Sequence, residues 1–159
     1  MIQNRRLPLG QIIFRGRFLN LLIYILALIA IQPLEEAIGA YSLLLDIIML
    51  FILVSAIYAV SHKKKHTIIG ILLAVPMLAS MLTKQFVGIR WMQIPETFFG
   101  IAFFIFIIII ILKFIFNEDE INRDLIAGAA AVYLMLAIAW AYAYSAIEVI
   151  QPGSLSMLG

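Results

Sequence analysis

Asp46 is the acidic residue that lies well inside an apolar run of the sequence, residues 40–60. A carboxylate within hydrocarbon is costly, so it is by default a hypothesis of function. Asp46 lies about one and a half turns from the expected outer end of its helix. From there it could instead reach the membrane interface or accept a hydrogen bond from a neighbouring hydroxyl or amide. Both interpretations stay open, with the structural one favoured.

The segment SHKKKH places two histidines four residues apart, around three lysines. On a helix, His62 and His66 have a spacing that can bind a metal ion. The ammonium groups of Lys63, Lys64 and Lys65 would repel such a cation, so we expect no metal here. The segment is interpreted as a short cytoplasmic loop that contacts anionic lipid headgroups.

The sequence carries no signature of catalysis. It has no cysteine, which excludes disulfides, thiolate chemistry and cysteine-based metal sites. It has no HExxH, no GxSxG, no phosphate-binding glycine loop and no pair of intramembrane carboxylates. We therefore predict that the protein is not an enzyme and has no catalytic residue, no cofactor and no metal site.

The composition predicts a membrane protein. Hydrophobic residues make up 65% of the 159 residues and charged residues 13%, with a mean hydropathy of +1.11. Soluble domains are roughly a quarter charged and about half apolar. A soluble fold of this length could not hide so much apolar surface from water.

Five apolar runs are each long enough to cross roughly 30 Å of hydrocarbon. Stretches such as FFIFIIIIIL do not alternate polar and apolar residues, as strands of a membrane barrel do. In hydrocarbon, a helix satisfies every backbone group within its own segment. The sequence therefore predicts an all-α, polytopic membrane protein with about five transmembrane helices, over residues 18–34, 40–60, 67–83, 97–112 and 125–147.

Prolines predict two departures from straight helices. Pro76 lies inside the third run, where we expect a kink. Pro33 and Gly39 bracket Glu35 and Glu36, a composition typical of a solvated turn. We therefore predict a tight outer turn over residues 33–39.

The positions of lysine and arginine predict the orientation. With the N-terminus inside, nine of the eleven basic residues lie in the cytoplasm, and Lys84 and Arg90 lie outside. The C-terminus is then outside. The chain divides into a basic cytoplasmic or interfacial leader (1–17), a four-helix transmembrane region (18–116), and an acidic cytoplasmic linker with the fifth helix and an outer tail (117–159).

The fifth helix differs from the fourth in composition. It is rich in Ala and Gly, and small residues four apart let helix backbones approach closely. We therefore expect it to be the most protein-covered span. The helix could pack within the monomer or at a subunit interface, and both interpretations stay open. The candidate packing residues are Gly128, Ala131, Tyr133, Ala139, Trp140 and Ala143.

One family shares several short motifs of this helix. The residues are Asp124–Leu125–Ile126, Gly128–Ala129–Ala130, Val132–Tyr133–Leu134, Ala139–Trp140–Ala141, Tyr144, Ile147–Glu148 and Pro152–Gly153–Ser154. Together they resemble the helix before the pore in small prokaryotic potassium-channel-like proteins of the two-transmembrane-pore (ion channel 2) type. The segment VSAIYAVSHKKK (54–65) also resembles the end of a second helix in these proteins.

The resemblance implies an ion channel for potassium transport in the prokaryotic inner (cytoplasmic) membrane, assembled as a homotetramer in its complete form. In that family a pore helix, a TxGYG-type filter and a last helix follow. No GYG or GFG occurs in these 159 residues, so the chain alone is not expected to conduct. We expect either the front part of a longer channel or a pore-less relative. The alternative is another five-helix membrane protein: a transporter subunit, an assembly factor or a lipid-binding partner. No nucleic acid is expected as a partner.

Overall fold

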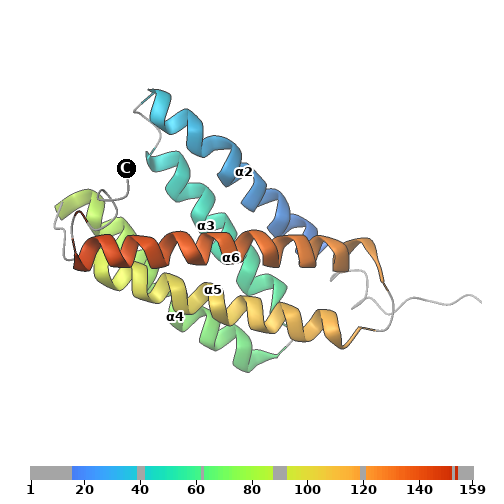
Figure 1. Cartoon of the computed structure of the whole chain (residues 1–159). Coiled ribbons are helices and arrows are strands. Elements are labelled where there is room, and N and C mark those ends of the chain that lie inside the picture. The colour runs from blue at the N-terminus through green and yellow to red at the C-terminus, as the bar shows by residue number, and fades with distance from the viewer. Residues whose placement is uncertain are drawn as a thin grey trace, which may run out of the picture.

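The computed structural model describes residues 16–38, 42–61, 63–87, 93–118, 121–151 and 153. These residues form an all-α fold, as predicted, with one helix at each predicted apolar run (Figure 1). The described helices are α2 (Arg17–Ile38), α3 (Ser42–Ala59), α4 (Lys64–Val87), α5 (Gln93–Phe116) and α6 (Arg123–Ile150).

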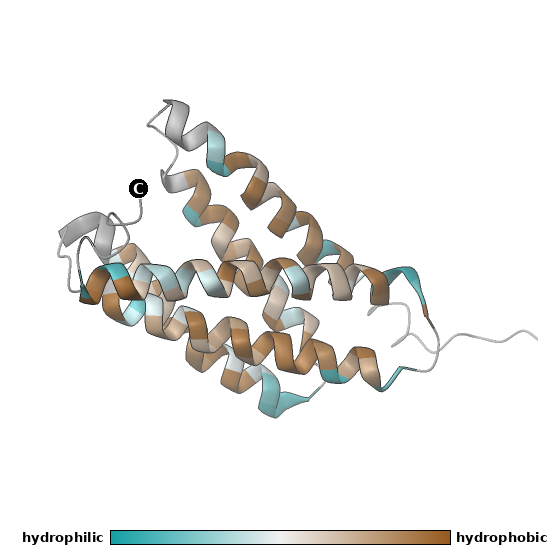
Figure 2. Ribbon diagram, viewed as in Figure 1, coloured by the Kyte–Doolittle hydropathy of each residue, from teal (hydrophilic) through white to brown (hydrophobic). Residues whose placement is uncertain are grey.

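Three of these helices are long and apolar enough to cross a membrane: α4 over Lys64–Thr83, α5 over Ile94–Phe116 and α6 over Arg123–Ile150. α2 and α3 carry shorter apolar stretches, Arg17–Pro33 and Leu44–Ala59. Apolar residues dominate the helices on all sides, and polar residues gather near their ends (Figure 2). Phe98 and Leu72, for example, leave 71% and 69% of their surfaces exposed. An apolar exterior of this kind suits a lipid environment.

The predicted turn over residues 33–39 is wrong for residues 33–38. α2 continues through Pro33, Glu35 and Glu36 and ends at Ile38. Pro33 lies inside α2 without ending it, and helices in apolar surroundings tolerate proline where neighbouring groups satisfy the freed backbone. Glu is a good helix former, and no glycine lies between Pro33 and Gly39, so no strong helix-ending residue follows Pro33 before Ile38.

The lysine segment is also more helical than predicted. Lys64, Lys65 and His66 belong to the first turn of α4, so the described turn before it is limited to Val60, Ser61 and Lys63. At its other end α4 continues past Thr83 to Val87. Pro76 lies inside the helix, and the Ser80 hydroxyl donates a hydrogen bond to its carbonyl oxygen at 2.9 Å.

The helices run up and down, and their packing is uneven. α5 packs extensively against α4 and α6, and α2 packs against α3 and α6, whereas α3 contacts α4 and α5 much less. The α2–α3 pair therefore joins the α4–α6 unit mainly through α2 and α6. Toward one end the pair diverges from α6 (Figure 1). The largest fully buried side chains include Phe18, Phe103, Phe104, Leu21, Ile25, Ile52, Leu53, Met77 and Met135.

The two ends of the bundle differ in charge. At the end where α2, α4 and α6 begin lie Arg17, Lys63, Lys113 and Arg123, and we call this the basic end. At the opposite end lie Asp46, Glu96 and Glu148, and we call this the acidic end. Basic residues far apart in sequence thus share one end, as the predicted N-inside orientation requires. The side of a membrane that this end faces stays a prediction.

Candidate functional site

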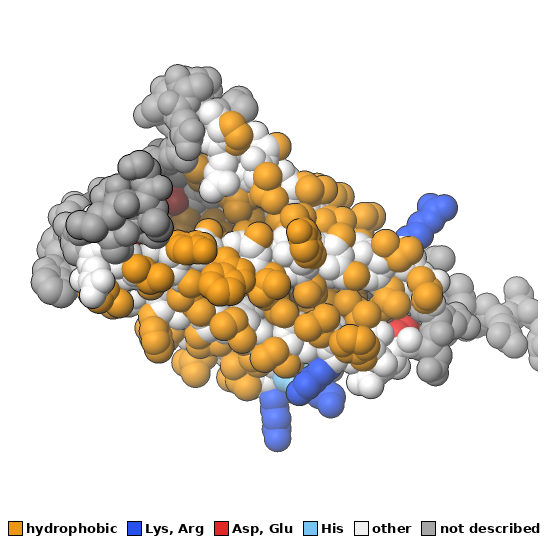
Figure 3. Space-filling view, viewed as in Figure 1, with side chains coloured by type: hydrophobic (Ala, Val, Ile, Leu, Met, Phe, Trp, Pro, Cys, Tyr) orange, Lys and Arg blue, Asp and Glu red, His pale blue; other side chains and the backbone are white. Residues whose placement is uncertain are grey.

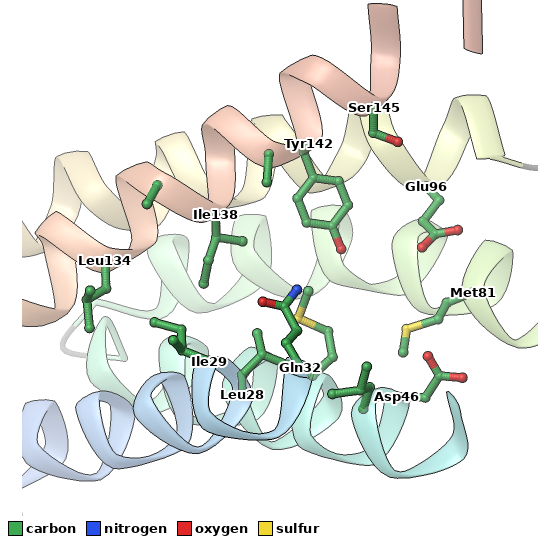
Figure 4. Close-up of a pocket in the computed structure, with 14 residues that line it drawn as sticks. Leu28, Ile29, Gln32, Asp46, Met81, Glu96, Leu134, Ile138, Tyr142 and Ser145 are labelled. Carbon is green, nitrogen blue, oxygen red and sulfur yellow. The ribbon is translucent and has the colours of Figure 1, made fainter. Parts of the chain in front are cut away.

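A cavity of about 570 Å³ opens at the acidic end, between the α2–α3 pair and the α4–α6 unit (Figure 4). Polar side chains from four helices line it: Gln32 from α2, Asp46 from α3, Glu96 from α5, and Tyr142 and Ser145 from α6. The rest of the wall is mostly apolar and includes Leu28, Ile29, Met49, Met81, Leu134 and Ile138. The cavity therefore combines two carboxylates with a large apolar surface.

Tyr142 is held in position by α5. Its ring packs on the backbone at Gly100, where an added Cβ would lie 3.0 Å from a ring carbon. The centroid of the Phe104 ring lies 5.8 Å from that of Tyr142. With the ring fixed in this way, the phenolic hydroxyl points into the cavity (Figure 4).

The two carboxylates come from helices that are not neighbours in the sequence. Asp46 is half-buried in the second turn of α3, and Glu96 is half-buried in the first turn of α5. Both act electrostatically on Tyr142, which places all three groups around the same space. Carboxylate, phenol and amide groups are acceptors for ammonium donors and for cations. The site is therefore suited to a positively charged ligand.

Glu96 is the site residue that the sequence analysis missed. It lies just before the predicted fourth span, where an acidic residue is ordinary and favourable at a helix N-terminus. Asp46 drew attention because it interrupts an apolar run. Only the tilt of the α2–α3 pair brings the two acids to one cavity, and no local pattern carries that information.

Asp124, in the first turn of α6, joins α6 to α2 at the basic end. One oxygen of its carboxylate accepts hydrogen bonds from the backbone N–H groups of Phe18 and Leu19, at 3.0 and 3.1 Å. These are N–H groups at the beginning of α2, which lack partners within their own helix. Asn122 caps α6 in turn, because its side chain accepts a 2.8 Å hydrogen bond from Leu125 N–H. The start of α6 thus fixes the start of α2.

Arg17 is buried at the same junction, with 3% of its surface exposed. Its guanidinium carbon lies 4.5 Å from the centroid of the Phe18 ring and 4.2 Å from that of Phe114. Such cation–π contacts gain strength where water is excluded. The carboxylates of Asp124 and Glu118 also attract the guanidinium. Arg17 is therefore a structural charge, paired within the bundle.

The predicted packing residues of α6 fall on two faces. Gly128, Ala131 and Ala139 are buried in the bundle, and an added Cβ at Gly128 would lie 3.1 Å from the Phe18 ring. Tyr133 and Trp140 point outward, with 74% and 60% of their surfaces exposed. The remaining predicted residue, Ala143, is half-buried. The inner face thus serves the monomer, and the outer face is uncovered in the single chain.

The prediction that α6 is the most protein-covered span is wrong. In the single chain, 33% of the most apolar stretch is buried in both α5 and α6, so α6 is not covered more than α5. Small residues allow close packing only on the face that meets α2 and α5, and bulky aromatic residues occupy the opposite face. Small side chains therefore predict a contact but not full enclosure.

The predicted lipid-headgroup lysines, Lys63, Lys64 and Lys65, are exposed at the basic end. A space-filling view shows lysine and arginine side chains at the margins of an otherwise apolar face (Figure 3). His66 is half-buried, with its ring centroid 6.3 Å from that of Phe106. His62 lies outside the described residues, so the possible His62–His66 pair stays untested.

No protein-family model matches the chain, and no curated protein or solved structure matches it. The functional interpretation therefore depends on the residues and on the geometry of the bundle.

Proposed function

We propose that this chain is the transmembrane scaffold of a prokaryotic potassium-channel-like protein, in which α6 is the helix that supports the pore. The observation that carries the proposal is the division of α6 into a buried small-residue face and an uncovered aromatic face. A helix that only completed a monomer would have no need of the second face. A helix that lies between its own bundle and neighbouring subunits would need both.

The depth of the aromatic residues strengthens this argument. At about 1.5 Å per residue, Tyr133 and Trp140 each lie roughly 5 Å from the midpoint of α6. Tyr and Trp that anchor a protein in lipid lie at the two interfaces instead, where the hydroxyl or indole N–H meets water. Near the middle of a membrane these groups need a protein partner. Neighbouring copies of the chain would supply it in a complete channel.

The residues behind the family resemblance also have definite roles at both ends of α6. Asp124 accepts hydrogen bonds from the start of α2, and Gly128 leaves room for Phe18. At the far end, the N–H of Gly153 donates a 2.8 Å hydrogen bond to the Glu148 carboxylate. Gly153 has a φ of 87°, a conformation that favours glycine. The resemblance therefore lies in residues that this fold uses, which supports the proposal.

Cysteine-directed photo-cross-linking in membranes tests the proposal, because the chain has no cysteine of its own. We expect Tyr133→Cys and Trp140→Cys, each labelled with a photoreactive thiol reagent, to form linked dimers, because a neighbouring copy would cover both positions in a ring of subunits. The matched control is Ile109→Cys, at a position on α5 that is 45% exposed. Equal cross-linking at Ile109, or none at the two α6 positions, would refute the α6 interface. The chain by itself should give no potassium flux in vesicles.

The acidic cavity favours a second candidate function, a cation-binding transporter subunit. Its apolar wall and two carboxylates suit an organic cation with a hydrophobic body. Tetraphenylphosphonium is a suitable probe, and its binding should weaken in Asp46→Asn and Glu96→Gln. Glu118→Gln is the control, since Glu118 lies at the opposite end. Saturable binding that both cavity variants abolish, without α6 cross-linking, would favour this candidate over the channel scaffold.

A further inference from the structure

We propose that a second cavity, at the basic end, binds the phosphate headgroup of an anionic phospholipid. The cavity has a volume of about 260 Å³ and lies where α2, α4 and α5 meet the turn between α3 and α4. The inference depends on the membrane location of the bundle, and it needs neither the channel assignment nor an oligomer.

Basic side chains from four separate segments line this cavity. Arg17 comes from the start of α2, Lys63 from the turn before α4, His66 from the first turn of α4, and Lys113 from the end of α5. Glu118 is the carboxylate in the lining, and Asp124 also attracts the Arg17 guanidinium. Arg17, Lys63 and Lys113 outnumber these two acids, so the local formal charge is positive. This favours an anionic ligand.

The basic side chains differ in how far they are buried, and this difference suits the binding of a phosphate headgroup. Arg17 is buried between two phenylalanine rings and gives a fixed positive charge in the wall. Lys63 and Lys113 are exposed and come from different helices or turns, so their flexible side chains can both reach a phosphate in the cavity. His66, which is half-buried, offers a further ring N–H.

The lining also distinguishes a lipid from a free anion. Besides its charged groups, the lining includes the apolar side chains of Ala59, Val60, Ile110 and Ile111. The cavity lies among helix ends, which is the level of the headgroups when the apolar spans cross a bilayer. Basic pockets between helix ends are typical sites for anionic headgroups. A phosphate ester with an attached acyl chain would meet both the charged groups and the apolar side chains of the lining.

The neighbouring lysines provide matched controls. Lys64 and Lys65 are exposed and follow Lys63 directly, but neither lines the cavity. Replacing any one of the three by glutamine removes the same charge from the same end of the bundle. A general attraction to a negative membrane surface would treat all three alike. A specific binding site would lose lipid affinity in the Lys63 variant and not in the Lys64 or Lys65 variants.

The test is lipid retention by the full chain. The protein, purified in detergent, is titrated with phosphatidylglycerol, and the bound lipid is measured by native mass spectrometry. We expect Lys63→Gln and Lys113→Gln each to weaken binding about fivefold, the effect of roughly one headgroup contact. Lys64→Gln and Lys65→Gln should stay within about twofold of the parent. Phosphatidylcholine and inorganic phosphate are titrated in parallel.

Three outcomes would overturn the inference. Equal losses in Lys63→Gln and Lys64→Gln would indicate diffuse attraction. Equal retention of phosphatidylcholine would remove the role of the negative charge, and full displacement of the lipid by inorganic phosphate would assign the site to the free ion. Membrane insertion is measured separately, by labelling Lys64→Cys before and after permeabilisation. Failure there refutes the membrane premise, whereas loss of lipid selectivity in an inserted protein refutes this site alone.

Discussion

The basic and acidic ends of the bundle use carboxylates in opposite ways. At the basic end, Asp124 is committed to the backbone of α2 and to Arg17, and the helices there are tightly joined. At the acidic end, Asp46 and Glu96 border a cavity between diverging helices (Figures 1 and 4). Carboxylates thus join two helices at the basic end, whereas at the acidic end they line a cavity.

The largest effect expected from this difference is that of Asp124→Ala. The change removes the acceptor for two backbone N–H groups and the nearby negative charge that compensates buried Arg17. We expect a loss of about 3 kcal/mol in the free energy of unfolding. Asp46→Ala at the acidic end removes a half-buried carboxylate and should cost less, about 1 kcal/mol. Denaturant unfolding in detergent, followed by circular dichroism, measures both, and equal losses would contradict the comparison.

A smaller effect is expected from enlarging an alanine of α6. Ala131 is fully buried, so Ala131→Leu should overpack the inner face and cost about 2 kcal/mol. Ala137 lies on the same helix but lines the acidic cavity, where a leucine finds room. Ala137→Leu should therefore leave the melting temperature nearly unchanged. If the two variants have the same melting temperature, the cavity is not open as described.

The smallest effect concerns two glycines. An added methyl group lies close to a ring in both cases, Phe18 for Gly128 and Tyr142 for Gly100. Phe18 is 1% exposed and packs against the Arg17 guanidinium and the Phe114 ring, whereas Tyr142 is only half-buried. Gly128→Ala should therefore cost about 1 kcal/mol, and Gly100→Ala should cost less. A larger loss for Gly100→Ala in thermal unfolding would mean that Tyr142 is as rigidly enclosed as Phe18.

The sequence predicts the helices well because each depends on a local pattern. Apolar runs locate α3, α5 and α6, and an Asn–Arg–Asp cluster coincides with the beginning of α6. The predicted turn at Pro33 is wrong because α2 continues for five residues beyond the proline. The unfavourable free energy of one proline near the helix end is therefore smaller than the favourable contribution of the helical residues that follow it. Helix ends depend on a few such small terms, so local composition settles them poorly.

The candidate sites are harder to predict, because each joins residues from three or more helices. Asp46 is visible in the sequence as an interruption of an apolar run, but Glu96 is not. Likewise Lys63, Lys64 and Lys65 look equivalent along the chain, and only the placement of α2 and α5 makes Lys63 part of a cavity. Tilt between helices is set by side-chain packing along their whole length, and short motifs do not encode it.

The hydrogen bond from Phe18 N–H to Asp124 joins residues 106 positions apart. Ribosomes add about 5–20 residues per second, so α2 emerges roughly 5–20 s before the carboxylate that caps it. During biosynthesis α2 therefore enters its surroundings with that end uncapped and with Arg17 lacking the Asp124 charge. The chain is made from α2 toward α6, but this junction forms only when α6 returns to α2.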